Sequence, residues 1–281
     1  MSLLDSLKRR DSRPGPPPAG RPRKGRPRPV EFVVFCDART GSYNLVSRLN
    51  SCADVVCHGE IFKKNRIEVS DFHRRKLSVK DTATRDAAPM AFIAELRALN
   101  PARHFGFKIF SGHLGWAPDA VDYLTAPGTR RILLMRPPLE IYASRLRAQE
   151  TGAWTLPTRR DPAKAPPKTA VRFTAESFEA FAQHYNRHVA TARMLAALPG
   201  SFVIHYGQTA DPAAMDALLG FLGSTGRFAD TSSEYRKQYD GSLREAFANW
   251  DELEATLPGL PPLAAIPAPT HAPFQPAESL A

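Results

Sequence analysis

The sequence contains few cysteines and no long apolar run. Its three cysteines, Cys36, Cys52 and Cys57, cannot all form pairs, which is typical of a reducing compartment. No stretch approaches the roughly 20 consecutive apolar residues that a membrane-spanning helix needs. Residues 1–10 are followed by proline and arginine instead of the apolar core of a signal peptide. We therefore expect a cytoplasmic protein.

The sequence also lacks the Gly-x-x-x-x-Gly-Lys-Ser/Thr loop of nucleoside triphosphatases. Instead, an apolar run over residues 32–36 is followed by a polar turn around Arg39, Gly41 and Ser42 and then by an amphipathic pattern. A strand, a turn and a helix in this order can cradle a phosphate, because backbone N–H groups and the helix dipole converge on one anion. Arg39 precedes the glycine and no lysine follows it, which disfavours ATP hydrolysis. Taken alone, the pattern also fits an ordinary βα turn.

A second strand-to-helix junction carries an arginine where many phosphotransferases carry an acid. The apolar run 131–136 ends in Arg136, and Pro137 and Pro138 follow at positions that suit a first helical turn. Ser144 comes eight positions after Arg136. An arginine from a strand end and a hydroxyl from the next helix can hold one phosphate together. A kinase would more often place an aspartate that organises Mg²⁺ at this strand end.

Two anion sites without an obvious magnesium carboxylate suit a nucleotide that carries phosphates at both its 5′ and 3′ positions. The motifs Ala38-Arg-Thr-Gly-Ser-Tyr43 and Arg136 with Ser144 resemble those of the sulfotransferases that use 3′-phosphoadenosine 5′-phosphosulfate (PAPS). The resemblance implies PAPS as the donor, no metal, and a 3′-phosphate held by Arg136 and Ser144. The implied 5′-phosphosulfate site consists of Arg39, Thr40, Gly41, Ser42 and Tyr43.

Further segments are similar to the bacterial carbohydrate branch of this family, which includes trehalose and lipopolysaccharide sulfotransferases. These segments are residues 59–62, 105–110, 147–154 and 204–207. The resemblance covers about 31–257, and it departs from the family at Thr40, Tyr43 and Gly207. It implies an α/β, P-loop-like three-layer fold and in-line transfer of a sulfuryl group to a hydroxyl of a carbohydrate or glycolipid. It also implies a homodimer.

Sulfuryl transfer needs a base for the acceptor hydroxyl and positive charge for the leaving phosphate. Glu60, in the Gly-Glu pair at 59–60, corresponds to the proposed base of the branch that this chain resembles. His113 is the competing base, because another branch uses a histidine after a lysine-containing strand and its unperturbed pKa suits the task. Arg39 is expected to neutralise the leaving phosphate. Lys108 could assist from the neighbouring strand, although it is expected to extend toward solvent, as strand lysines usually do.

Apolar runs of strand length alternate with helical patterns, which predicts a parallel sheet covered by helices on both faces. The predicted strands are 31–36, 105–110, 131–136 and 202–206. The predicted helices are 42–50, 90–100, 139–150, 175–198, 212–222 and 243–256. We expect one sulfotransferase domain over 31–260, a disordered Pro/Arg-rich tail at 1–30 and a Pro/Ala-rich tail at 261–281. The Pro- and Lys-rich residues 156–168 predict a mobile loop near the acceptor entrance.

The formal net charge of +10 leaves two other functions open. A kinase-like phosphotransferase would share the first cradle but depend on Mg²⁺ and ATP. A non-catalytic polyanion-binding protein would owe its affinity to the basic tail, which could also touch an anionic membrane. We expect no specific binding of nucleic acid. No metal-binding histidine cluster is predicted, and His184 and His188, one helical turn apart, are expected to form a surface pair.

Overall fold

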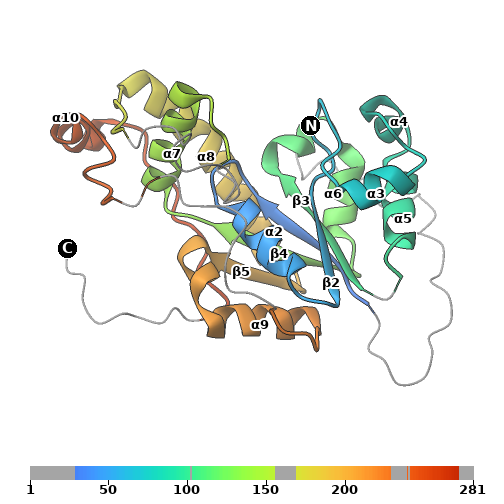
Figure 1. Cartoon of the computed structure of the whole chain (residues 1–281). Coiled ribbons are helices and arrows are strands. Elements are labelled where there is room, and N and C mark those ends of the chain that lie inside the picture. Colours follow the sequence, from blue (N-terminus) through green and yellow to red (C-terminus); the bar gives the residue numbers. More distant parts are fainter. Residues whose placement is uncertain (1–28, 102, 156–168, 229–238, 240, 272–281) are drawn as a thin grey trace.

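The computed structural model describes residues 29–101, 103–155, 169–228, 239 and 241–271. Five strands form one sheet in the order β2-β3-β1-β4-β5, and all neighbouring strands are parallel (Figure 1). The strands are β1 (Glu31–Cys36), β2 (Val55–Glu60), β3 (His104–Phe110), β4 (Thr129–Met135) and β5 (Ser201–His205). Parallel strands place their carboxyl ends at one edge, where ligands of such folds bind.

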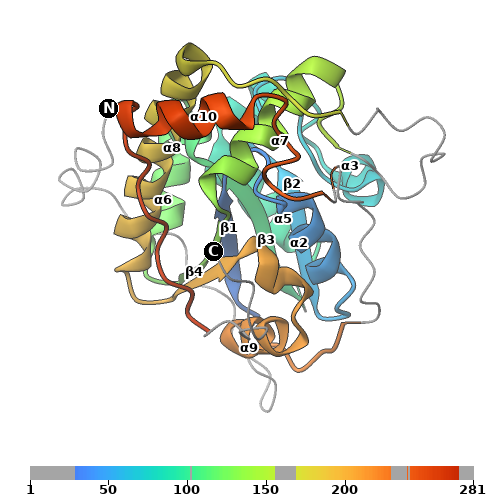
Figure 2. The ribbon, with the colours of Figure 1, turned by 90° about the vertical axis from the view of Figure 1, so that its left-hand side faces the viewer.

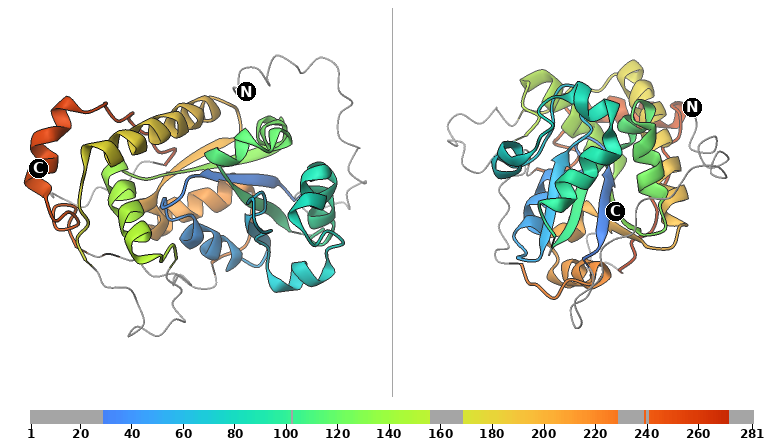
Figure 3. Two further views of the ribbon diagram at one scale, coloured as in Figure 1. Left: turned by 90° about the horizontal axis from the view of Figure 1, so that it is seen from above. Right: turned by 90° about the vertical axis from the view of Figure 1, so that its right-hand side faces the viewer.

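Helices cover both faces of this sheet, as Figure 3 shows for α2 and α9 on one side and α6 and α8 on the other. One layer contains α2 (Ser42–Asn50) and α9 (Pro212–Leu222), and the other contains α5 (Pro89–Ala98), α6 (Pro118–Thr125) and α8 (Ala175–Ala196). The remaining helices are α3 (Asp71–Lys76), α4 (Thr82–Ala87), α7 (Pro138–Thr151) and α10 (Trp250–Thr256). The predicted three-layer α/β fold is confirmed.

The central strand shows why the core divides into two clusters. Along β1, Phe32 and Val34 pack toward α2 and α9, whereas Val33 and Phe35 pack toward the opposite layer. All four side chains are completely buried, because successive residues of a strand point to opposite faces and both faces are covered. The continuous apolar run therefore reflects a strand that lies in the middle of a parallel sheet.

Several elements differ from the prediction: the short helices α3, α4 and α6 were not predicted, and neither were strand β2 and the late start of α10. Strand β2 was not predicted, because its apolar run is short and ends in His58 and Gly59. The predicted helix 243–256 begins only at Trp250, because the preceding backbone pairs with another segment. Val171 donates its N–H to the carbonyl of Ala246 at 2.9 Å and accepts from the N–H of Ala248 at 2.8 Å, and this tertiary pairing overrides the helical pattern.

The C-terminal part of the described chain runs beside α8 and ends against β5 (Figure 2). Asn186 of α8 donates to the carbonyl of Pro262 at 2.9 Å. Farther along, Val203 of β5 receives a hydrogen bond from the N–H of Thr270 at 3.0 Å and donates its own N–H to the Thr270 hydroxyl at 2.8 Å. These contacts hold Pro262 against α8 and Thr270 on the edge of β5.

Residues 1–28 and the predicted loop 156–168 lie outside the described residues. The predicted division into a tail, a domain and a second tail therefore stays a prediction. Within the described part of the chain, no helix combines the length and the apolarity that are needed to cross a membrane.

The close approach of β1 and β3 generates a prediction at Gly106. Gly106 faces Phe32, and a Cβ at this position would come within 2.3 Å of the Phe32 ring. Both strands are in the middle of the sheet, so neither can move aside easily. We expect Gly106→Ala to lower the free energy of unfolding by about 1–3 kcal/mol, measured by chemical denaturation. Gly128→Ala is the control, because nothing lies within 4 Å of its Cβ position, and an equal loss there would contradict the packing argument.

Candidate active site

The turn between β1 and α2 adopts an unusual backbone conformation. Among the described residues, Arg39 is the one non-glycine residue with a positive φ, at 69°, and Gly41 follows with φ of 86°. The hydroxyl of Thr40 donates to the carbonyl of Asp37 at 2.7 Å and closes the turn. Gly41 is the N-cap of α2 and supplies no side chain. The amino end of a nine-residue helix therefore opens at the carboxyl edge of the sheet, which is a favourable position for an anion.

Gly41 is required here for a second reason. A Cβ at this position would lie 2.2 Å from the ring of Tyr206, which follows β5. The ring of Tyr206 in turn lies 4.4 Å from the guanidinium of Arg136. The Gly-containing turn, the aromatic ring and the arginine therefore form one packed unit.

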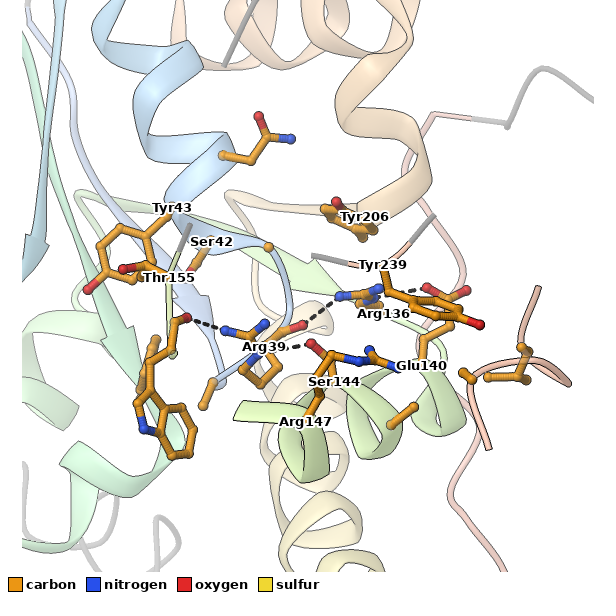
Figure 4. A pocket seen from close by; sticks show the side chains of 18 of the residues that line it. Arg39, Ser42, Tyr43, Arg136, Glu140, Ser144, Arg147, Thr155, Tyr206 and Tyr239 are labelled. Atoms are coloured by element: carbon orange, nitrogen blue, oxygen red, sulfur yellow. Dashed lines mark hydrogen bonds and ion pairs between the residues drawn. The ribbon is translucent and has the colours of Figure 1, made fainter. Parts of the chain in front are cut away.

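A pocket of about 660 Å³ lies between this turn and α7 (Figure 4). Its wall includes Arg39, Ser42, Arg136, Ser144 and Arg147, and Glu60 lies at the same pocket. The two motifs predicted as separate anion sites thus meet at one cavity. The exposed ring of Trp154 and the ring of Tyr206 also line it.

The two motifs are joined by hydrogen bonds, drawn as dashed lines in Figure 4. Arg39 Nε donates to Ser144 Oγ at 2.9 Å, and Arg136 Nη1 donates to the carbonyl oxygen of Arg39 at 2.9 Å. Arg136 Nε also donates to Glu140 at 2.9 Å. Arg136 therefore holds the cradle turn itself, and a bound phosphate must exchange some of these contacts.

Arg147 is a pocket residue that the sequence interpretation missed. It was noted only as part of a family signature, yet it lies on the pocket-facing side of α7, one turn beyond Ser144. Its side chain is almost fully buried, and its Nη2 atom has no hydrogen-bond partner among the described residues. Spacing along the helix from Ser144 was the signal that could have identified it.

The neighbouring arginines disfavour the positive charge of Arg39. Burial, together with the charges of Arg136 and Arg147, lowers the pKa of Arg39 to about 10. Several guanidinium groups therefore gather at one pocket. This concentration of arginines, together with the buried Arg147 donor that lacks a hydrogen-bond partner in the described part of the chain, fits a ligand with several phosphate oxygens.

Glu60 reaches the same pocket from the end of β2. The pairing of β2 with β3 shifts register between His58 and Glu60, and such bulges turn side chains at strand ends. Gly59 at the bulge allows Glu68 to pack closely, because a Cβ there would lie 2.8 Å from the Glu68 side chain. Glu68 accepts hydrogen bonds from the Glu60 N–H at 3.2 Å and from the Tyr43 hydroxyl at 2.9 Å. No pattern in the sequence indicated this role for Glu68.

Lys108 and His113, from β3 and the 3₁₀ turn η2 (Ser111–Gly115), flank the Glu60 carboxylate. Lys108 Nζ lies 3.4 Å from Oε1, and His113 Nε2 lies 3.5 Å from Oε2. The two candidate bases predicted from the sequence are therefore in contact. The expectation for Lys108 was wrong: its side chain is fully buried, with Nζ 3.2 Å from the Tyr43 ring centroid. The pocket-facing carboxylate of Glu60 and the aromatic ring give the buried ammonium group its partners.

These neighbours determine the charge of Glu60. Burial raises the pKa of Glu60, but the hydrogen bond from His113 and the charge of Lys108 outweigh it, so the pKa lies below its ordinary value. Burial likewise lowers the pKa of Lys108, against the charge of Glu60. Glu60 is consequently ionised at neutral pH and can accept a proton.

The histidines of α8 differ from the expected surface pair. His188 is fully buried and stacks on Phe35 at 5.1 Å between ring centroids, while His184 Nε2 contacts the carboxylate of Asp37. Burial raises the pKa of Asp37, but the hydrogen bond with His184 and the charge of His188 lower it below its ordinary value. Asp37, at the end of β1, is therefore an ionised carboxylate fixed at the same edge of the sheet.

A second, smaller pocket adjoins the first at Glu60 and Phe110. It measures about 420 Å³, and its wall also includes Asp37, Lys64, His113 and Trp116. Within the described residues, no group of three histidine, cysteine or acidic side chains gathers in a way that could hold a metal ion.

Comparisons with known proteins return sulfotransferases. No protein-family model matches the chain. Nodulation protein H of Rhizobium tropici, a sulfotransferase, is 26% identical over 243 residues, which are 84% of this chain and 92% of the relative. The crystal structure of a sulfotransferase from Alicyclobacillus acidocaldarius is 16% identical, with 82% of this chain and 92% of that chain covered and a TM-score of 0.44. A mouse sulfotransferase complexed with PAP is 14% identical, with coverages of 91% and 86% and a TM-score of 0.42.

The crowding at Gly41 yields a prediction about nucleotide binding. In Gly41→Ala, the new methyl group would collide with the Tyr206 ring and occupy a backbone conformation that alanine avoids. We expect binding of 3′-phosphoadenosine 5′-phosphate (PAP) to weaken at least about 100-fold in calorimetric titration, because both motifs depend on this turn. The matched control is Gly207→Ala, beside Tyr206 but with nothing within 4 Å of its Cβ position. Equal binding by both variants would remove the turn from the nucleotide site.

Proposed function

We propose that this chain, a PAPS-dependent sulfotransferase, transfers a sulfuryl group to a hydroxyl of a carbohydrate or glycolipid. The resemblance to this enzyme family is confirmed by the sequence match to Nodulation protein H over most of both chains. The observation that carries the proposal is a single pocket that is lined by four arginines and, on the same wall, by the ionised carboxylate of Glu60. Cations for a phosphate donor and a base for a hydroxyl are thereby placed side by side.

The arginine pocket supplies the donor site. We assign the 5′-phosphosulfate to the turn Arg39 to Tyr43, where the start of α2 and the Arg39 guanidinium meet. The 3′-phosphate is assigned to Arg136 and Ser144, and Arg147, with its unpaired Nη2, is added to this set. When bound, PAPS supplies the activated sulfuryl group; the chain's own residues hold its phosphates and stabilise the negative charge on the leaving group.

The hydrogen bonds of His113 favour Glu60 as the base. The backbone N–H of Phe110 donates to His113 Nδ1 at 3.2 Å. A neutral imidazole has one N–H, so the hydrogen of His113 lies on Nε2, which faces Glu60. In this tautomer neither ring nitrogen has a free lone pair for the acceptor. We therefore assign His113 the role of holding Glu60 in position, and Glu60 the role of proton acceptor.

The reaction is then a direct in-line displacement. The acceptor oxygen forms a bond to sulfur as the bond between sulfur and the 5′-phosphate oxygen breaks. The hydroxyl proton passes to Glu60, and the electron pair of the broken bond leaves with the phosphate, which Arg39 neutralises. The products are a sulfate ester and PAP.

The remaining predictions are part of the same proposal. A carbohydrate acceptor, a bacterial source and a homodimer follow from the family branch that the motifs resemble. A cytoplasmic location is proposed because the three cysteines cannot all form pairs. Contact of the basic residues 1–30 with an anionic membrane would suit a glycolipid acceptor. A kinase-like reaction is disfavoured because Arg136 follows β4 where such enzymes place an acid.

The donor assignment predicts selective binding of PAP. Titration of the purified protein should show PAP bound more tightly than AMP or ATP, without added metal. Arg136→Ala should weaken PAP binding roughly tenfold to 100-fold, because one charge-assisted hydrogen bond contributes about 1.5–3 kcal/mol. The same variant should weaken AMP binding less than PAP binding, because AMP lacks the 3′-phosphate and loses only the support that Arg136 gives to the cradle turn. A preference for ATP that requires Mg²⁺ would instead establish the kinase alternative.

The base assignment predicts separate effects on turnover and binding. Glu60→Gln keeps the side-chain size but cannot accept the proton, so turnover should fall by about 10²- to 10⁴-fold while PAP binding persists. His113→Gln retains an N–H toward Glu60, so its turnover should fall much less than that of Glu60→Gln. The turnover of His113→Ala should fall more than that of His113→Gln. In the unmodified enzyme, activity should decline as the pH falls through the lowered pKa of Glu60, because protonation removes the acceptor. Normal turnover by Glu60→Gln would transfer the role to His113.

A further inference from the structure

The smaller pocket beside Glu60 contains an aromatic ring that is held in place but partly exposed. Trp116 has an exposed fraction of 38%, although its Nε1 donates to the carbonyl of Phe62 at 3.2 Å. Its ring also lies 5.2 Å from that of His113, which contacts Glu60. A large ring fixed next to the proposed base can serve as a platform for a substrate.

A lysine lies over this ring in a replaceable contact. Lys64 Nζ is 4.6 Å from the centroid of Trp116, and the Lys64 side chain is solvent-exposed. Exposed cation–π contacts contribute only about 0.5–1 kcal/mol. An incoming ligand can therefore displace Lys64 from the ring at little cost and use its ammonium group as a hydrogen-bond donor.

The same pocket holds a second carboxylate besides Glu60. Asp37 accepts a hydrogen bond from the N–H of Ala38 at 2.8 Å on Oδ1 and contacts His184 through Oδ2, so its side chain has a fixed orientation. Ionised carboxylates only accept hydrogen bonds, so two of them in one pocket of about 420 Å³ favour a ligand with more than one hydroxyl donor. An alcohol with a single hydroxyl would displace water from the Asp37 carboxylate without donating a hydrogen bond in its place.

We propose that this pocket binds a sugar ring of the acceptor, with Trp116 as its platform. This inference rests on the proposed function, because Glu60 must accept the proton of one of the ring's hydroxyls. The C–H groups on one face of a pyranose are apolar and carry slight positive charge, so they suit the negative face of an indole. A neighbouring hydroxyl donates to Asp37, and Lys64 donates to a ring or hydroxyl oxygen.

The test uses full-length protein saturated with PAP and trehalose as the sugar probe, with cyclohexanol as a ring that has one hydroxyl. Saturation-transfer NMR and calorimetry should detect trehalose and not cyclohexanol at equal concentration. Trp116→Ala should weaken trehalose binding at least about tenfold, and Trp116→Phe should recover part of the lost affinity. Asp37→Asn should also weaken trehalose binding.

Phe72→Ala is the matched control, because Phe72 is 49% exposed and has Lys76 at 4.2 Å from its centroid but lies outside the pocket. This variant should bind trehalose normally. PAP affinity is measured for each variant, which separates folding or donor defects from acceptor defects. Failure of the unmodified protein to bind PAP would overturn the proposed function. PAP binding without trehalose binding, or trehalose binding unchanged in Trp116→Ala, would overturn the sugar site and leave the donor site intact.

Discussion

The ion pair between Lys108 and Glu60 joins the sheet to the chemistry. These residues are partners on adjacent strands, and the ammonium group has the carboxylate on one side and the Tyr43 ring on another. Removing two charges from water is costly, and such a pair contributes little or nothing to stability compared with apolar side chains. Its value lies in fixing an ionised carboxylate next to an arginine-rich pocket. The bulge at Gly59, the packing of Glu68 and the burial of His113 all support this position.

Charge is distributed unevenly across the two pockets. Four arginines line the larger pocket, three of them from the β1 turn, the end of β4 and α7, while two carboxylates and two lysines balance one another at the smaller one. A polyanionic donor and a neutral polyhydroxyl acceptor would therefore be sorted by electrostatics before any shape recognition. Glu60 is common to both pockets, as a base must be if it is to act between donor and acceptor.

Sequence patterns predicted the fold well, because the strands of a parallel sheet are apolar throughout and the helices between them are amphipathic. Arg39 and Arg136 could be assigned to one edge since each follows a predicted strand. Lys108 could not be placed correctly, because its burial depends on a partner from β2, a strand that the pattern did not reveal. Glu68 acts through contacts with Gly59 and Tyr43 that only the folded chain brings together.

Both edges of the sheet are occupied over part of their length. On β5, Thr270 forms hydrogen bonds with the backbone N–H and carbonyl of Val203. On β2, the N–H of Gly59 donates to the carbonyl of Glu68 at 3.1 Å. Open strand edges invite pairing between molecules, and covered ones resist it. Two copies of this chain consequently cannot merge their sheets at these positions without first peeling a segment away. At these positions a second copy can contact only the covering segments and not the strands themselves.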